Sequence, residues 1–156
     1  MGWDTEDLVA ALQHAASSAL HDGRAQLEVI PRTAPEPGLV RLSPRNDAAA
    51  SVLVQIDDDD QVTVQLGAHQ LPIEIRRTDA ERLLSEVSEL VATVVNDGYV
   101  ELSRRKRGKM QILAEIGRGP RKRTATYNLF RGTIDALRNR EGWTETRYTG
   151  YCDEGS

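Results

Sequence analysis

The chain has little of what several functional classes require. Its single cysteine, Cys152, cannot form an internal disulfide, which excludes a disulfide-stapled fold. Only 4% of its 156 residues are aromatic, which disfavours a stacking platform for single-stranded nucleic acid. No apolar run approaches the roughly 20 residues of a membrane helix, and the acidic start lacks a signal peptide's apolar stretch. We therefore expect a soluble, cytoplasmic protein that does not bind membranes.

Motifs for catalysis, cofactors and metals are missing as well. There is no Gly-x-Ser-x-Gly elbow, and Gly108-Lys109 lacks the earlier glycine of a phosphate-binding loop because residue 103 is serine. No pair of histidines has metal-ligand spacing, and the cysteine has no neighbouring Cys or His. The histidines are His14, His21 and His69. A nucleophile–base pair stays open, since such partners can be distant in sequence, but we predict a protein that is not an enzyme and has no cofactor or metal.

Charge is distributed unevenly along the chain. The net charge is −4, but residues 1–97 carry 17 acidic and 7 basic side chains, a net charge of −10. Residues 98–156 carry 7 acidic and 13 basic side chains, a net charge of +6. Such a distribution can steer a charged partner towards one part of a protein. Arginines outnumber lysines 17 to 3, and each guanidinium offers a planar donor fork for bidentate contacts.

Helix signals enclose a central run of strands. Asp4 is a good N-cap for a first helix that ends at Gly23. Thr78 to Glu81 matches a capping box, with Thr78 as the N-cap, and the long helix that follows ends at Asp97-Gly98. Its apolar face consists of Leu83, Leu84, Val87, Leu90, Val91, Val94 and Val95. A short C-terminal helix is expected over 133–140.

Alternating apolar residues predict strands between and after these helices. Short polar connections join most of them, which favours antiparallel pairing because a parallel pair needs a long crossover. We predict an α+β fold in which an antiparallel sheet is covered by the N-terminal helix and the long central helix. It forms one domain over 1–151, followed by a tail, 152–156. The expected strands are 26–30, 52–56, 62–66, 71–75, 99–105, 110–116 and 124–130, with an edge strand within 143–151.

Residues 31–50 interrupt the pattern with four of the six prolines. Proline has no N–H to donate to a neighbouring strand, so any strand here should be short or at an edge. We expect a Pro-rich loop. A loop of twenty residues within a compact domain is either functional or disordered, and the composition does not separate the two.

An acidic run lies between the first two central strands. The run is Asp57, Asp58, Asp59 and Asp60. A helix-loop-helix calcium site would need glycine at its sixth position and glutamate at its twelfth, but these positions hold Val62 and Ala68. Aspartate is a common turn residue. We therefore predict a solvated hairpin turn, whose carboxylates could also contact a basic partner.

Two basic groups follow the long helix and are the most informative feature. The first is Arg104, Arg105, Lys106, Arg107 and Lys109, and the second is Arg118, Arg121, Lys122 and Arg123. A hairpin around Gly108 places the groups at its opposite ends, and alternation places Arg105 and Arg107 on one side of it. These residues form either a docking surface for an acidic protein or a nucleic acid, or solvated turns that discourage edge-to-edge aggregation.

A resemblance follows from the stretch Val62 to Gly67, the helix Glu86 to Val95 and the run Asp97 to Glu101. Together they resemble small actinobacterial α+β proteins of the immunity type, which are found beside polymorphic toxins. The likeness spans roughly residues 60–151 and rests on a pattern of strand, glycine turn, long helix and Gly-aromatic-x-Glu. It implies neutralisation of a toxin by binding, without a catalytic site. The order of helix, sheet and helix is also similar to that of small secretion chaperones.

The leading hypothesis is a protein-binding module that masks or escorts a protein partner, such as a toxin. Its binding residues would be Arg105, Arg107, Lys109, Arg121 and Arg123 for an acidic partner, or Asp57 to Asp60 for a basic one. The alternative is a nucleic-acid-binding module that uses the basic turns of residues 104–123.

Overall fold

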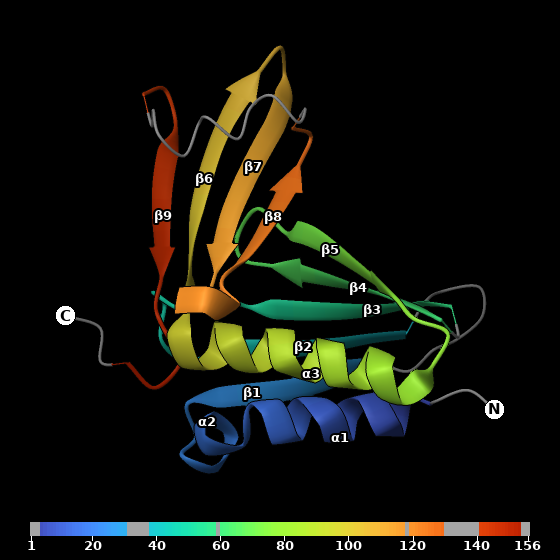
Figure 1. Ribbon diagram of the computed structural model, residues 1–156. Helices are drawn as coiled ribbons and strands as arrows, with labels where there is room; N and C mark the ends of the chain where they lie inside the picture. Colours follow the sequence, from blue (N-terminus) through green and yellow to red (C-terminus); the bar gives the residue numbers. More distant parts are fainter. Residues whose placement is uncertain (1–3, 31–37, 59, 118, 130–140, 154–156) are drawn as a thin grey trace.

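The computed structural model describes residues 4–30, 38–58, 60–117, 119–129 and 141–153 (Figure 1). They form the predicted α+β fold, with antiparallel strands and a long central helix. The strands divide into two sheets, of five and four strands. The expected short helix over 133–140 lies outside the described residues. Within the described part of the chain, no helix has both the length and the apolarity needed to cross a membrane.

The first sheet is an antiparallel meander in which every strand pairs with the next one along the chain. Alternate residues point to opposite faces of a strand, and one face of this sheet is apolar. Val54, for example, lies opposite Val40 on one neighbour and Val64 on the other, and all three are buried. The strands are β1 (Ala25–Ile30), β2 (Gly38–Pro44), β3 (Val52–Asp58), β4 (Gln61–Leu66) and β5 (Leu71–Arg76).

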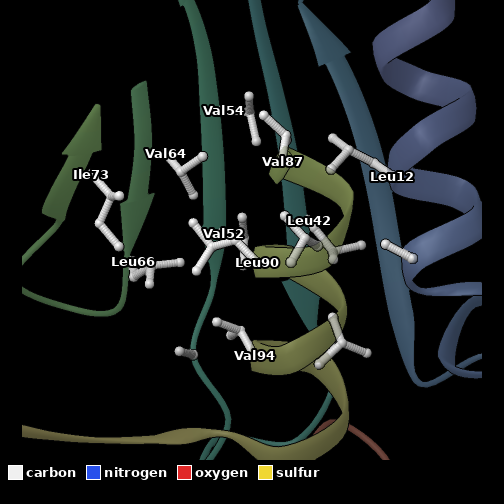
Figure 2. Close-up of a cluster of buried hydrophobic side chains, with 14 of the residues drawn as sticks. Leu12, Leu42, Val52, Val54, Val64, Leu66, Ile73, Val87, Leu90 and Val94 are labelled. Atoms are coloured by element: carbon white, nitrogen blue, oxygen red, sulfur yellow. The ribbon is translucent and has the colours of Figure 1, made fainter. Parts of the chain in front are cut away.

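Two helices, α1 (Thr5–Ala15) and α3 (Ala80–Asp97), lie side by side and cover the apolar face of this sheet (Figure 1). Figure 2 shows Leu12 of α1 and Leu90 of α3 in one cluster with the labelled valines and leucines of β2, β3 and β4. Of the apolar residues predicted to line the long helix, all are buried except Leu84, which is half-buried. The core of the protein therefore lies between this helical layer and the first sheet.

The helix ends differ in detail from the sequence prediction. Asp4 caps α1 as expected and exchanges hydrogen bonds with Asp7 in a capping box. The prediction of Thr78 as the cap of α3 is wrong. Asp79 occupies that position, and its carboxylate accepts from the backbone N–H of Glu81 at 2.9 Å. A carboxylate is at least as good a cap as a hydroxyl and also interacts favourably with the helix dipole.

The first helical segment is broken rather than continuous. Helix α1 ends before Ala16, whose backbone departs from helical geometry, and a short helix α2 (Ser17–His21) follows. Gly23 then ends the segment with a φ of +70°, as predicted.

Strand β2 corrects the prediction for residues 31–50. It lies between β1 and β3 inside the sheet and pairs with both, so it is neither a loop nor an edge strand. Pro44 is the last residue of the strand. Val40 and Leu42 are fully buried. Because Pro44 comes at the end of β2, it does not interrupt the ladder that the alternating apolar residues of 38–43 form. The other three prolines belong to residues 31–37, which lie outside the described residues.

The second sheet has the strand order β8-β7-β6-β9 and projects away from the helix-covered body (Figure 1). It begins directly after α3, where Gly98 has a φ of +69° and a Cβ atom would lie 1.9 Å from the backbone oxygen of Tyr148. Only glycine fits this position. The strands are β6 (Tyr99–Lys106), β7 (Lys109–Ile116), β8 (Arg123–Tyr127) and β9 (Thr144–Tyr148), with a 3-10 turn, η1 (Gly119–Arg121), before β8. The predicted hairpin and the predicted C-terminal edge strand are both confirmed.

Candidate functional site

The far end of the second sheet carries the first basic group. Strands β6 and β7 are joined by a two-residue turn, Arg107-Gly108, in which both residues have positive φ, +53° and +77°. This is the turn geometry that suits the twist of a tight hairpin. It places Lys106 directly opposite Lys109, and like charges in that position repel each other. We call residues 104–109 the basic end.

One face of the basic end borders a groove of about 650 Å³. Its basic lining residues are Arg104, Lys106, Arg107 and Lys109, and its uncharged ones are Gln111, Thr126, Asn128 and Leu129. Within the described part of the chain, no carboxylate lines the groove and no ion pair involves any of the four basic side chains. We call this hollow the basic groove.

The two faces of the hairpin differ from the predicted arrangement. Arg105 lies opposite Met110 in the register, on the other face of the strand from Arg104, and does not line the groove. The prediction that Arg107 shares a side with Arg105 is wrong, because Arg107 lines the groove together with Arg104 and Lys106. Strand alternation does not extend through the left-handed turn in which Arg107 lies.

Arg104 is held in place by two contacts. Its Nε donates to Oε1 of Gln111 at 2.8 Å, and its guanidinium lies 4.2 Å from the centre of the Trp143 ring. A stacked and hydrogen-bonded guanidinium loses little further freedom on binding an anion. Arg104 was not among the predicted binding residues. Its alternation with Arg105 was the only signal in the sequence that could have placed it on the groove side.

The second basic group lies at the opposite end of the hairpin and has acidic neighbours. Lys122 forms an ion pair with Glu115. Arg123 is exposed and borders a separate hollow of about 540 Å³, which also has Glu86, Glu89 and Asp97 in its lining. Arg121 lies in η1, but its side chain is outside the described residues. The predicted basic residues therefore do not form one continuous surface.

The acidic run lies at the β3–β4 connection, well away from the basic end (Figure 1). Asp57 and Asp58 are the last residues of β3, Asp60 lies in the turn, and Asp59 is outside the described residues. The carboxylate of Asp57 accepts from Gln55 at 2.8 Å and from Thr63. These two hydrogen bonds hold the Asp57 side chain on the outer face of the sheet. No group of three or more metal-ligating side chains is found among the described residues.

Sequence reasoning missed a polar cluster between the two sheets. Nδ1 of His69, in the β4–β5 turn, lies 2.8 Å from Oε2 of Glu101 on β6, whose side chain is fully buried. The other carboxylate oxygen, Oε1, and the hydroxyl of Tyr99 are buried without a hydrogen-bond partner among the described residues. The ring of Tyr148 lies 4.7 Å from that of Tyr99, and its hydroxyl accepts from the N–H of Ala68. We call these four side chains the inter-sheet junction.

The inter-sheet junction is a structural connection rather than an open site. Burial raises the pKa of Tyr99, with the Glu101 carboxylate as a second cause, and burial also raises the pKa of Tyr148. Both rings thus stay neutral. The turn fits against them because residue 67 is glycine, where a Cβ atom would lie 2.4 Å from the Tyr99 hydroxyl. The alternation of β6 could have indicated this role for Glu101, since it shares a face with Tyr99.

Comparison with protein-family models, curated proteins and solved structures finds no match to this chain. Its function must therefore be inferred from the geometry of its own residues.

Proposed function

We propose that this protein is a non-catalytic binding module that acts in the cytoplasm by masking a protein partner, in the manner of an immunity protein or a chaperone. The observation that carries the proposal is the basic end, where four basic side chains surround a groove without an ion-pair partner among the described residues. An acidic surface on a partner would supply the missing counter-charges.

The geometry of the hairpin supports docking because the arrangement costs stability in the free protein. Lys106 and Lys109 repel each other across the strands, and Arg107 adopts a left-handed backbone that costs a non-glycine residue about 1–2 kcal/mol. An acidic partner would relieve the repulsion. It would also accelerate association through electrostatic steering.

Affinity capture with charge-reversal variants tests the proposal. The immobilised protein should retain a specific protein from a lysate of its source organism, and Lys106→Glu/Lys109→Glu should lose it. The matched control, Arg105→Glu/Arg123→Glu, makes the same change in charge outside the groove and should retain it. The purified partner should then associate more slowly as salt increases, because screening weakens steering. If wild type captures no protein, the proposal is wrong, and if wild type and both variants capture the same proteins, the basic end is not the binding surface.

A nucleic-acid titration distinguishes protein binding from the alternative function, nucleic-acid binding. Binding to phosphates would release counterions, so the affinity for duplex DNA would fall with salt at a log–log slope near −0.9 per contact. The protein-binding proposal expects only weak DNA binding, with a Kd above about 10⁻⁶ M at physiological salt. Sub-micromolar, strongly salt-dependent binding that Lys106→Glu/Lys109→Glu abolishes would establish the nucleic-acid function instead.

A further inference from the structure

We infer that the basic groove binds a short acidic segment of a protein chain, with Arg104 as its anchor and Lys106 and Lys109 as flanking contacts. This inference rests on the proposed function and specifies the chemistry of the partner. It assigns recognition to one face of the β6–β7 hairpin, whereas the exposed basic residues Arg105 and Arg123 lie outside the groove.

Arg104 has the properties of an anchor. Stacking on Trp143 uses a face of the guanidinium and the hydrogen bond from Nε to Gln111 uses one edge, so the two terminal nitrogens stay available to donate. Two parallel N–H groups match the two oxygens of a carboxylate. Because the side chain is already ordered, binding costs less conformational entropy than it would at a mobile lysine.

The remainder of the lining suits a peptide. Gln111 and Thr126 lie beside the cations and can hydrogen-bond to a peptide backbone, and Leu129 provides an apolar contact. Asn128 is held in a left-handed conformation, with its Nδ2 donating to the carbonyl oxygen of Met110 at 3.2 Å. The groove thus combines basic side chains, which can bind acidic side chains, with uncharged polar and apolar ones, which can contact the rest of a polypeptide.

Two observations favour a short acidic peptide over a nucleic acid. No aromatic residue is among the described residues that line the groove, whereas single-stranded nucleic acid is usually bound by stacking bases on aromatic rings. The positive charge is also local, since residues 1–97 carry a net charge of −10. A long polyanion would extend over acidic regions of the protein and be repelled there, while a short acidic segment would contact only the basic end.

The test is fluorescence anisotropy with a labelled hexaglutamate peptide, using the full chain at low salt. Wild type should bind the peptide, and Lys106→Gln/Lys109→Gln should bind it about ten-fold more weakly, because two charge-assisted contacts are lost. These lysines are exposed and repel each other, so the variant should remain folded. The matched control, Arg105→Gln/Arg123→Gln, removes the same charge outside the groove and should change the Kd less than about two-fold.

A second variant tests the anchor. Arg104→Lys keeps the charge but removes the fork and its stacking, so it should bind hexaglutamate several-fold more weakly than wild type while its circular dichroism spectrum is unchanged. Equal affinity for Arg104→Lys and wild type would overturn the assignment of Arg104 as the anchor.

Three results would overturn the inference as a whole. The first is no binding of hexaglutamate. The second is equal weakening by the groove variant and the control, which would indicate a response to net charge alone. The third is tighter, groove-dependent binding of a hexathymidylate oligonucleotide, which would identify a nucleic-acid site.

The outcome is separable from that of the proposed function. If a partner is captured equally by wild type and by Lys106→Gln/Lys109→Gln, the module binds proteins through another surface and only the groove inference fails. If hexaglutamate binds in the groove but no protein is captured, the groove inference holds and the masking function fails.

Discussion

At the scale of single residues, the contact between His69 and Glu101 connects the two sheets at a buried point. The Glu101 side chain is fully buried, whereas that of His69 is 35% exposed. A buried carboxylate that loses its only hydrogen-bond partner retains its full desolvation penalty. The pair therefore matters for stability mainly because removing His69 would leave the buried Glu101 carboxylate without a hydrogen-bond partner.

A double-mutant cycle tests this. We expect His69→Ala to lower the free energy of unfolding by about 1–3 kcal/mol in the wild-type protein, as measured by urea denaturation at pH 7. In a Glu101→Leu background the same substitution should cost less than about 0.5 kcal/mol, because no buried charge remains to be orphaned. Equal costs in the two backgrounds would show that the contact contributes no coupling.

At the scale of secondary-structure elements, α3 depends on its cap and on its apolar face. Its N-cap is Asp79 rather than the neighbouring threonine. The helix spans 18 residues and buries Leu83, Val87 and Leu90 against the first sheet. Any loss of its first turn also loosens the layer that covers the core.

The two neighbouring residues provide a matched pair of variants. Asp79→Ala removes the acceptor for the Glu81 N–H and should lower the free energy of unfolding by about 1 kcal/mol. Thr78→Ala changes an exposed side chain outside the cap and should change it by less than about 0.5 kcal/mol. Thermal or urea denaturation of both variants measures the difference. A larger loss for Thr78→Ala would restore the threonine as the cap.

The second sheet shows the limit of pattern reasoning at this scale. The two strands of the hairpin were predicted within one residue, because alternation and the Gly108 turn are local features, while β8 ends three residues earlier than predicted. Their division into two sheets was not predicted. The division depends on where the chain lies when α3 ends. Strand β6 begins directly after α3 and pairs with β7 and β9 instead of joining the first sheet.

At the scale of the whole molecule, three tyrosines join distant segments. Tyr99 and Tyr148 connect the two sheets. Tyr151, near the end of the described chain, donates its hydroxyl to the carbonyl oxygen of Ala50 at 2.6 Å. Burial raises the pKa of Tyr151 and of Tyr99 above the ordinary value of 10.0.

The raised pKa values predict loss of stability in alkali. Above pH 10 the unfolded chain releases protons that native Tyr99 and Tyr151 retain, so the free energy of unfolding falls as pH rises. Two such groups give a slope of up to about 3 kcal/mol per pH unit, while below about pH 9 they contribute little pH dependence. Urea denaturation at pH 8 to 11 measures the slope. Tyr151→Phe should reduce the slope by about half, and constant stability to pH 11 would contradict the prediction.

The candidate site illustrates what residue patterns can and cannot place. The basic residues around Gly108 were recognised because they are close together along the sequence. Their separation from Arg123 followed from the length of the hairpin. The selection of Arg104 over Arg105 required the structure, because the stacking partner Trp143 and the groove residue Thr126 come from later segments of the chain.

The sequence by itself determined the two helices that cover the first sheet, most of the strands, the antiparallel connections and the charge of each segment. These depend on periodicity, capping and turn residues, which act over a few neighbours. Only the tertiary structure decided that the strands form two sheets, that β2 lies inside one of them, and that Glu101 is buried against His69. Each of these depends on which distant segments meet, and the free energy of such contacts comes from burial and pairing that no local pattern records.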